Sequence, residues 1–125
     1  MSTTYQAASP AQLNHTAAKI FNHIMDKWQI NENERPRLAS LNSEDYARWH
    51  CGELLSGSSG LPVLVSHLMA IHTLLHQMFH NAEQADSWIT RPNSNLNGQS
   101  AIELIQQQGV TGAVKVRDLL EANVF

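Results

Sequence analysis

Apolar residues recur at spacings of three and four along most of this chain, and this period constrains the fold more than any other feature. Near the N-terminus, Ser9, Pro10 and Gln12 are typical of a helix start. The stripe that follows consists of Leu13, Ala17, Ile20, Ile24 and Trp28. No segment alternates apolar and polar residues as a half-buried strand does, so we predict a small all-α protein.

Two short helices are predicted after this first one. Asn31 followed by Glu34 is typical of a helix N-cap with its box partner, and so is Asn42 or Ser43 followed by Glu44 and Asp45. Residues 39–42 leave room only for a tight turn. Residues 31–52 are therefore predicted to form helix, turn, helix.

Gly52 and the run S-G-S-S-G at residues 56–60 break the helical pattern and indicate a module boundary. Beyond it we expect helices over 62–80, 81–89, 100–109 and 111–123, with a loop at 91–98. The third of these is bracketed by Ser100, Glu103 and Gly109. We divide the chain into a flexible N-terminus at 1–10, a helix-turn-helix module at 11–60 and a helical module at 61–125.

Four of the seven histidines lie within residues 67–80, which raises the question of a metal site. His72, His76 and His80 have i, i+4 spacing, but on a helical wheel they lie beside the apolar face, on its solvent border. A zinc site needs ligands from more than one direction, and this row supplies one. No H-E-x-x-H pattern occurs. We therefore expect no native metal and no stoichiometric zinc.

Composition narrows the function classes. The formal net charge of −3 and the pI of about 6.1 give no bulk attraction to nucleic acid or to anionic membranes. Cys51 is the only cysteine, which excludes an intramolecular disulfide and favours a reducing, cytoplasmic setting. The N-terminal residues do not resemble a signal peptide, and no run is long enough for a membrane span, so we expect a soluble protein. No cofactor motif or catalytic arrangement occurs, and the protein is not expected to be an enzyme.

Residues 85–105, A-D-S-W-I-T-R-P-N-S-N-L-N-G-Q-S-A-I-E-L-I, resemble the toxin-binding domain of the Xre/MbcA/ParS antitoxin family. The matching positions are Trp88, Pro92, Asn93, Leu96, Gly98, Leu104, Gly109, Val114 and Leu119. Upstream, residues 28–34 and 43–53 resemble the family's Xre-like helix-turn-helix. The positions that match there are Trp28, Tyr46, Arg48, Trp49 and Gly52.

The chain departs from the family pattern at three places. Leu38, Ala39 and Ser40 replace Leu-Leu-Gly before the turn, and Pro36 is expected to interrupt the preceding helix. Ala101 stands where proline is frequent. Glu44 and Asp45 open the recognition helix, where basic or neutral residues are more usual.

The resemblance implies an antitoxin of a type II toxin-antitoxin system that neutralises a RES-domain toxin, a class that consumes NAD or transfers ADP-ribose. It further implies a homodimer, for which Leu61, Leu64, Leu68 and Met69 offer apolar helix faces. Trp88, Pro92, Asn93, Leu96 and Gly98 are predicted to build the scaffold of the module. Toxin contact is predicted on the last helix and the tail, at Arg117, Glu121, Asn123, Val124 and Phe125.

Two alternatives remain open. The first is a DNA-binding regulator, alone or as autoregulation of the antitoxin's own operon, in which Arg35, Arg37, Arg48 and His50 contact operator DNA. Against it, residues 11–60 carry five Lys or Arg and six Asp or Glu. The second is an interaction module without a toxin partner.

Overall fold

The computed structural model describes residues 10–53 and 60–123, and within these ranges it contains helices and no strand. The first module has α1 (Pro10–Lys27), α2 (Arg35–Leu38) and α3 (Ser43–His50). The long α4 (Leu61–Met78) is followed by α5 (Ala82–Ser87), the 3-10 turns η2 (Trp88–Thr90) and η3 (Ser94–Leu96), α6 (Ala101–Gln108) and α7 (Val110–Glu121). The predicted all-α class is confirmed.

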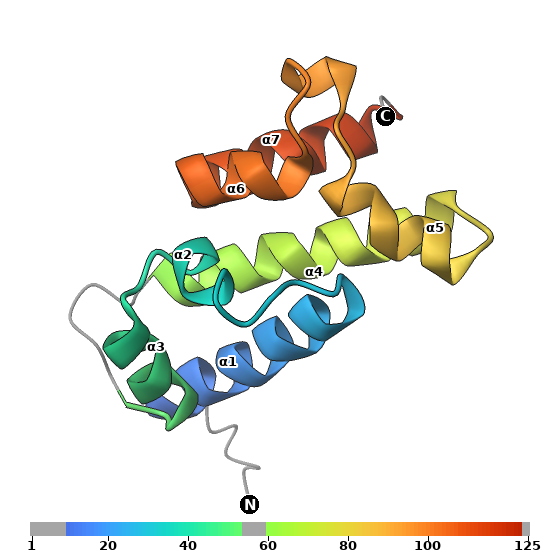
Figure 1. Ribbon diagram of the computed structural model, residues 1–125. Coiled ribbons are helices and arrows are strands. Elements are labelled where there is room, and N and C mark those ends of the chain that lie inside the picture. The colour runs from blue at the N-terminus through green and yellow to red at the C-terminus, as the bar shows by residue number, and fades with distance from the viewer. Residues whose placement is uncertain (1–9, 54–59, 124–125) are drawn as a thin grey trace, which may run out of the picture.

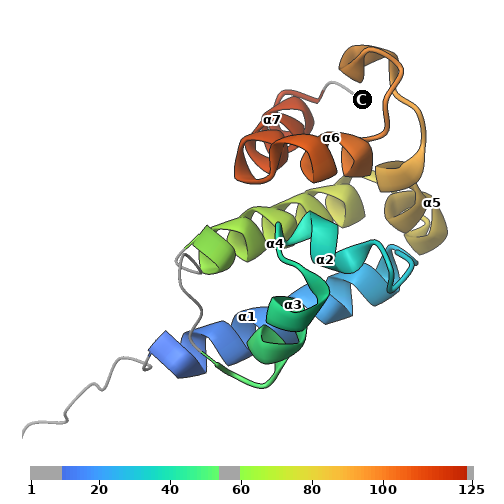
Figure 2. The ribbon, with the colours of Figure 1, turned by 60° about the vertical axis from the view of Figure 1, so that its left-hand side comes forward.

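Helix α4 is the middle layer of the molecule. It packs against α1 on one side and against α7 on the other, while α6 pairs with α7, as Figures 1 and 2 show from two directions. This position explains its apolar composition, because both faces are covered: Leu68, Ile71 and Leu75 are completely buried. The predicted boundary near residue 60 falls between α3 and α4, yet α4 shares its core with both halves of the chain.

An aromatic cluster attaches α3 to α1. Trp49 and Phe21 are completely buried, with ring centroids 5.3 Å apart in an edge-to-face arrangement. Tyr46 contacts both rings in the same manner, with each centroid at 6.1 Å. Such pairs add roughly 0.5–1.5 kcal/mol beyond the burial of their surface. The cluster fixes how α3 lies on α1.

The helix that precedes the turn differs from the prediction. It begins at Arg35 rather than at Asn31, and its N-cap Glu34 makes no side-chain capping bond. Pro36 does not interrupt it, because the proline sits in the first turn, where a backbone N–H has no partner within the helix. Of the two caps left open for the second helix, the structure has Asn42, whose Oδ1 accepts from the amide of Asp45 at 2.7 Å.

The faces proposed for dimerisation are mostly internal. Leu61, Leu64 and Leu68 are at most 5% exposed, and of the four residues named only Met69 is exposed, at 45%. The sequence could not reveal that α4 is covered on both sides. Homodimer formation stays a prediction, now with Leu13, Val63 and Met69 as the large apolar side chains at the surface of the described residues.

Residues 10–53 and 60–123 include no helix with both the length and the apolar character needed to cross a membrane.

Candidate functional site

The C-terminal module starts with a short capped helix that carries a buried indole. Asn81 caps α5, its side chain accepting from the amides of Glu83 at 2.8 Å and Gln84 at 3.2 Å. The chain then tightens into η2, where Trp88 and Ile89 are 7% and 0% exposed. Trp88 therefore lies in the core, as a large side chain at a crossing of several helices does.

The loop at 91–98 is closed by Asn93. Its amide donates to the carbonyl of Gln99 and its carbonyl accepts from Gly98, both at 2.9 Å. Its side chain accepts from the amide of Asn95 at 2.8 Å. Leu96 is 9% exposed and anchors the loop to the core. The loop is a compact unit with its own hydrogen bonds.

Two consecutive residues with left-handed backbone conformations form the turn that ends this loop. Asn97 has φ +59° and Gly98 has φ +83°, conformations that asparagine and glycine adopt most easily. Pro92 is exposed and forms an isolated antiparallel bridge with Ser100. The Asn-Gly dipeptide was the sequence signal for this turn, and the role of Asn97 was not predicted.

Helices α6 and α7 form a close antiparallel pair. Ser100 and Glu103 make the predicted capping box on α6, and Gly109 at φ +60° separates the two helices. Gly112 faces the backbone of α6 without a side chain between them: a Cβ there would lie 2.5 Å from the carbonyl oxygen of Leu104. This close approach positions α7, whose Val116 and Leu120 are buried against α4.

The predicted toxin contacts lie at the end of α7. Arg117 Nε donates to Glu121 Oε1 at 2.8 Å, with side-chain exposures of 36% and 49%. Arg117 also reaches α4, where its guanidinium lies 3.3 Å from His67 Nδ1. Asn123 is exposed, whereas the predictions for Val124 and Phe125 fall outside the described residues. The accessible part of this set is therefore Glu121 and Asn123.

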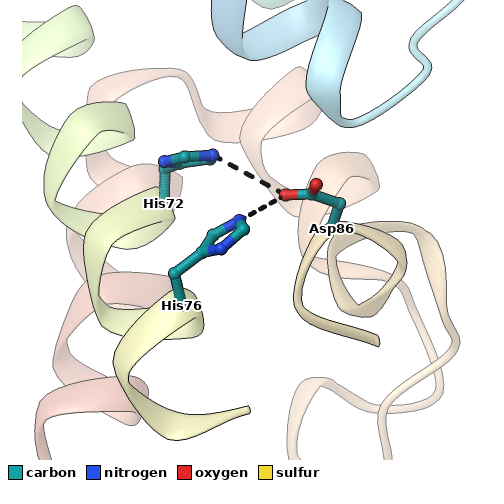
Figure 3. A group of neighbouring side chains, drawn as sticks. All are labelled: His72, His76 and Asp86. Carbon is teal, nitrogen blue, oxygen red and sulfur yellow. Dashed lines mark hydrogen bonds and ion pairs between the residues drawn. The ribbon is translucent and has the colours of Figure 1, made fainter. Parts of the chain in front are cut away.

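Two of the histidines meet a carboxylate from another helix. His72 and His76 extend from α4 towards Asp86 on α5 (Figure 3). His76 Nε2 lies 2.7 Å and His72 Nε2 3.6 Å from the same oxygen, Asp86 Oδ1. His72 and His76 still extend from one helix, but Asp86 adds a carboxylate from a second direction, which was not predicted. This contact could not be foreseen from residue spacing, because α5 folds back onto α4 only in the tertiary structure.

The surroundings of His72 determine its burial and shift its pKa. It lies against Trp28 of the first module, with ring centroids 6.5 Å apart, and its side chain is 26% exposed. Burial lowers the pKa of His72, with a further lowering from the neighbouring His76, whereas Asp86 acts in the opposite direction. The net shift favours the neutral form of its imidazole.

A cleft of about 660 Å³ opens beside this cluster, between the end of α1 and α5. Its walls include Trp28, Glu83 and Asp86, together with the cations Lys27 and Arg91. The cleft lies where the two halves of the chain meet.

Most of the side chains proposed to contact DNA are instead bonded to groups of the protein itself. Arg35 is 7% exposed, and its guanidinium donates to the carbonyl of Ile30, to Asn22 Oδ1 and to Asp26 Oδ1, at 2.9–3.0 Å. It therefore holds α1 to the turn before α2 and cannot reach a phosphate. The assignment of Arg35 to DNA stays an untested prediction, and its burial argues against it, since the side chain satisfies groups inside the fold.

The other three candidates differ among themselves. Arg48 lies within 4 Å of carboxylate oxygens of Glu44, Asp45 and Glu53, so its charge is neutralised locally. His50 is part-buried, with Nδ1 2.9 Å from the carbonyl of Tyr46. Arg37 is exposed on α2. The surface of the helix-turn-helix is thus less basic than the residue types alone indicate.

Residues 74–122 match the family model described as the antitoxin Xre/MbcA/ParS C-terminal toxin-binding domain. Over 121 residues the chain is 29% identical to the uncharacterized protein y4oB of Sinorhizobium fredii (strain NBRC 101917 / NGR234), covering 93% of this chain and 86% of that protein. The fold is similar to a chain of the crystal structure of the M. tuberculosis MbcT-MbcA toxin-antitoxin complex, with a TM-score of 0.57 and 18% identity, covering 86% of this chain and 96% of that one. At this identity the structural likeness shows a common fold alone.

Proposed function

We propose that this chain, whose residues 74–122 belong to the Xre/MbcA/ParS antitoxin family, is the antitoxin of a type II toxin-antitoxin system and neutralises a RES-domain toxin by binding it. The family match confirms the resemblance drawn from residues 85–105. It is also the observation that carries the proposal, because the matched segment is a toxin-binding domain. The protein acts by binding, without chemistry of its own, in a cytoplasm that keeps the exposed Cys51 thiol free.

The end of α7 is the surface proposed to contact the toxin. Glu121 is bonded to Arg117 within its own helix, and such an exposed i, i+4 pair contributes only roughly 0.3–0.5 kcal/mol. Glu121 can therefore exchange its partner for a toxin arginine at little cost. A toxin that binds NAD needs cations for the phosphates of its substrate, and a carboxylate from an antitoxin can occupy them.

A truncated protein that ends at Glu121 is expected to stay folded but to fail to protect cells from the co-expressed toxin. The core residues Val116 and Leu120 are kept, whereas Asn123, Val124 and Phe125 are lost. Circular dichroism measures folding, and growth on toxin induction measures protection. Full protection by the truncated protein would show that the tail is not the inhibitory surface. The loop at 91–98 would then be the next candidate.

A charge reversal supplies a matched pair of variants. Glu121→Lys is expected to weaken co-purification with the toxin, because the new positive charge would repel the cations with which the toxin holds the phosphates of its substrate. Lys115→Glu is the control: it lies six residues earlier on α7, about 120° away around the helix, and its Nζ bonds to Gln108. The two variants change the net charge in opposite directions, so equal weakening by both would argue that Glu121 makes no specific contact with the toxin.

DNA binding is retained as a second function because α2 and α3 are joined by a short turn, as in helix-turn-helix proteins. Weak binding with strong salt dependence is expected for the protein alone. Glu44→Lys with Asp45→Lys should strengthen it, because the change adds two cations and removes two of the carboxylates around Arg48.

The slope of log affinity against log salt should then steepen by about two, as measured on the promoter upstream of the operon. Glu83→Lys with Asp118→Lys changes the net charge equally but on α5 and α7. If both double variants bind alike, α3 does not face DNA.

A further inference from the structure

We propose that His72, His76 and Asp86 form a binding site for a divalent transition metal, with Zn²⁺ as the ion it fits best. This reverses the expectation from the sequence, since Asp86 supplies the second direction that the histidine row lacked. The proposal concerns the free protein and does not depend on its partner toxin.

The three ligand atoms already converge. Both Nε2 atoms face Asp86 Oδ1, at 2.7 and 3.6 Å, and one ligand atom from each of the three residues lies within 4.8 Å of the others (Figure 3). Zinc bonds of roughly 2.0–2.1 Å in a tetrahedron place neighbouring ligand atoms roughly 3.3 Å apart. The separation of His72 from Asp86 is close to that value, and that of His76 from Asp86 must widen by roughly half an ångström.

A second observation independently points to a ligand. His72 Nε2 is buried and makes no hydrogen bond. An unsatisfied buried polar atom is uncommon in folded proteins and calls for an explanation such as a bound ion. Coordination would supply the missing partner at the place where the atom is already directed, towards Asp86.

The donor set selects the class of metal. Two imidazole nitrogens and one carboxylate oxygen suit zinc and its transition-metal neighbours, whereas calcium and magnesium prefer oxygen ligands throughout. Three protein ligands leave a fourth tetrahedral position for water or for a group from a partner.

The proposed ligands join two helices. His72 and His76 belong to α4, and Asp86 belongs to α5, a helix of six residues. An ion held between them fastens α5 and the adjoining Trp88 to α4. Because such an ion binds the folded state, it raises the melting temperature, and the rise grows with the logarithm of the free zinc concentration once the site is largely occupied.

The test uses the full chain without a histidine tag, titrated with ZnCl₂ by calorimetry and with CoCl₂ by absorption spectroscopy. We expect one ion per chain, a rise in melting temperature and a visible cobalt spectrum of tetrahedral intensity. Asp86→Asn is expected to weaken zinc binding at least about tenfold. His80→Ala, which removes the next histidine of the row but no proposed ligand, should bind like the unchanged protein.

His76→Gln is the second variant, because glutamine can still donate to Asp86 while it is a poor metal ligand. It too should lose zinc at least about tenfold, with an unchanged circular dichroism spectrum. Absence of binding at millimolar zinc would overturn the proposal. Undiminished binding by either Asp86→Asn or His76→Gln, or an equal loss in His80→Ala, would also overturn it, since the ion would then sit elsewhere.

Discussion

Replacing Arg35 with alanine is expected to lower the free energy of unfolding by about 2–4 kcal/mol, which corresponds to a fall in melting temperature of roughly 10 °C. The guanidinium is buried and donates to three different acceptors. Asp26 is 68% exposed and can turn to water, so the ion pair itself contributes little. The loss comes mainly from the buried Ile30 carbonyl and the partly buried Asn22 side chain, whose oxygens lose a charged donor.

Arg37→Ala is the matched control for this prediction. Arg37 lies two residues further along the same short helix and is exposed, so its replacement should change the free energy of unfolding by no more than about 0.5 kcal/mol. Chemical denaturation of both variants measures the difference. Similar stabilities of the two would mean that the hydrogen bonds of Arg35 do not hold the turn to α1.

Tyr46 on α3 lies beside the same group of polar side chains. Burial raises the pKa of Tyr46 to about 12, an effect that the charge of Arg35 partly opposes. The Tyr46 hydroxyl lies 3.4 Å from Asn22 Oδ1, the acceptor that Arg35 also uses. Arg35, Asn22 and Tyr46 therefore form one polar contact between α1, α2 and α3.

Replacing Gly112 with alanine is expected to cost about 1–3 kcal/mol. The added Cβ would lie 2.5 Å from the Leu104 carbonyl oxygen and 3.1 Å from the Ile105 Cα, both of them backbone atoms that cannot rotate away. Helices α6 and α7 must then separate, which loosens the packing of Ile105 and Val116. The usual preference of helices for alanine over glycine, up to about 1 kcal/mol, does not offset this clash.

Gly60→Ala provides the comparison. Gly60 precedes α4 with φ −80°, and a Cβ there meets nothing within 4 Å, so the stability should change by no more than about 0.5 kcal/mol. Thermal unfolding monitored by circular dichroism distinguishes the two variants. Gly112→Ala should also weaken protection against the toxin, because α7 is displaced. An unchanged melting temperature would show that the two helices can separate without loss.

Local signals in the sequence located most helices correctly. Asn42, Asn81, Ser100 with Glu103, and Gly109 each act within one turn of the chain, and each stands at the helix end that it bounds. The cap predicted at Asn31 by the same kind of signal is wrong. Its carbonyl accepts from the amide of Glu34 in a turn, and the helix starts only at Arg35. There Ile30, buried in the core, and Arg35, bonded to α1, decided where the chain could become helical.

The all-α class, most of the capped ends and the family motif of the C-terminal module can be predicted from the sequence, because a helical period and its caps depend on residues three or four positions apart. The tertiary packing selects which side chains meet. It buried Arg35 and the leucines proposed for dimerisation, because α4 is covered on both sides. It brought Asp86 to His72 and His76, because α5 folds back along α4. These contacts join residues ten or more positions apart, or different helices, and packing rather than periodicity selects them.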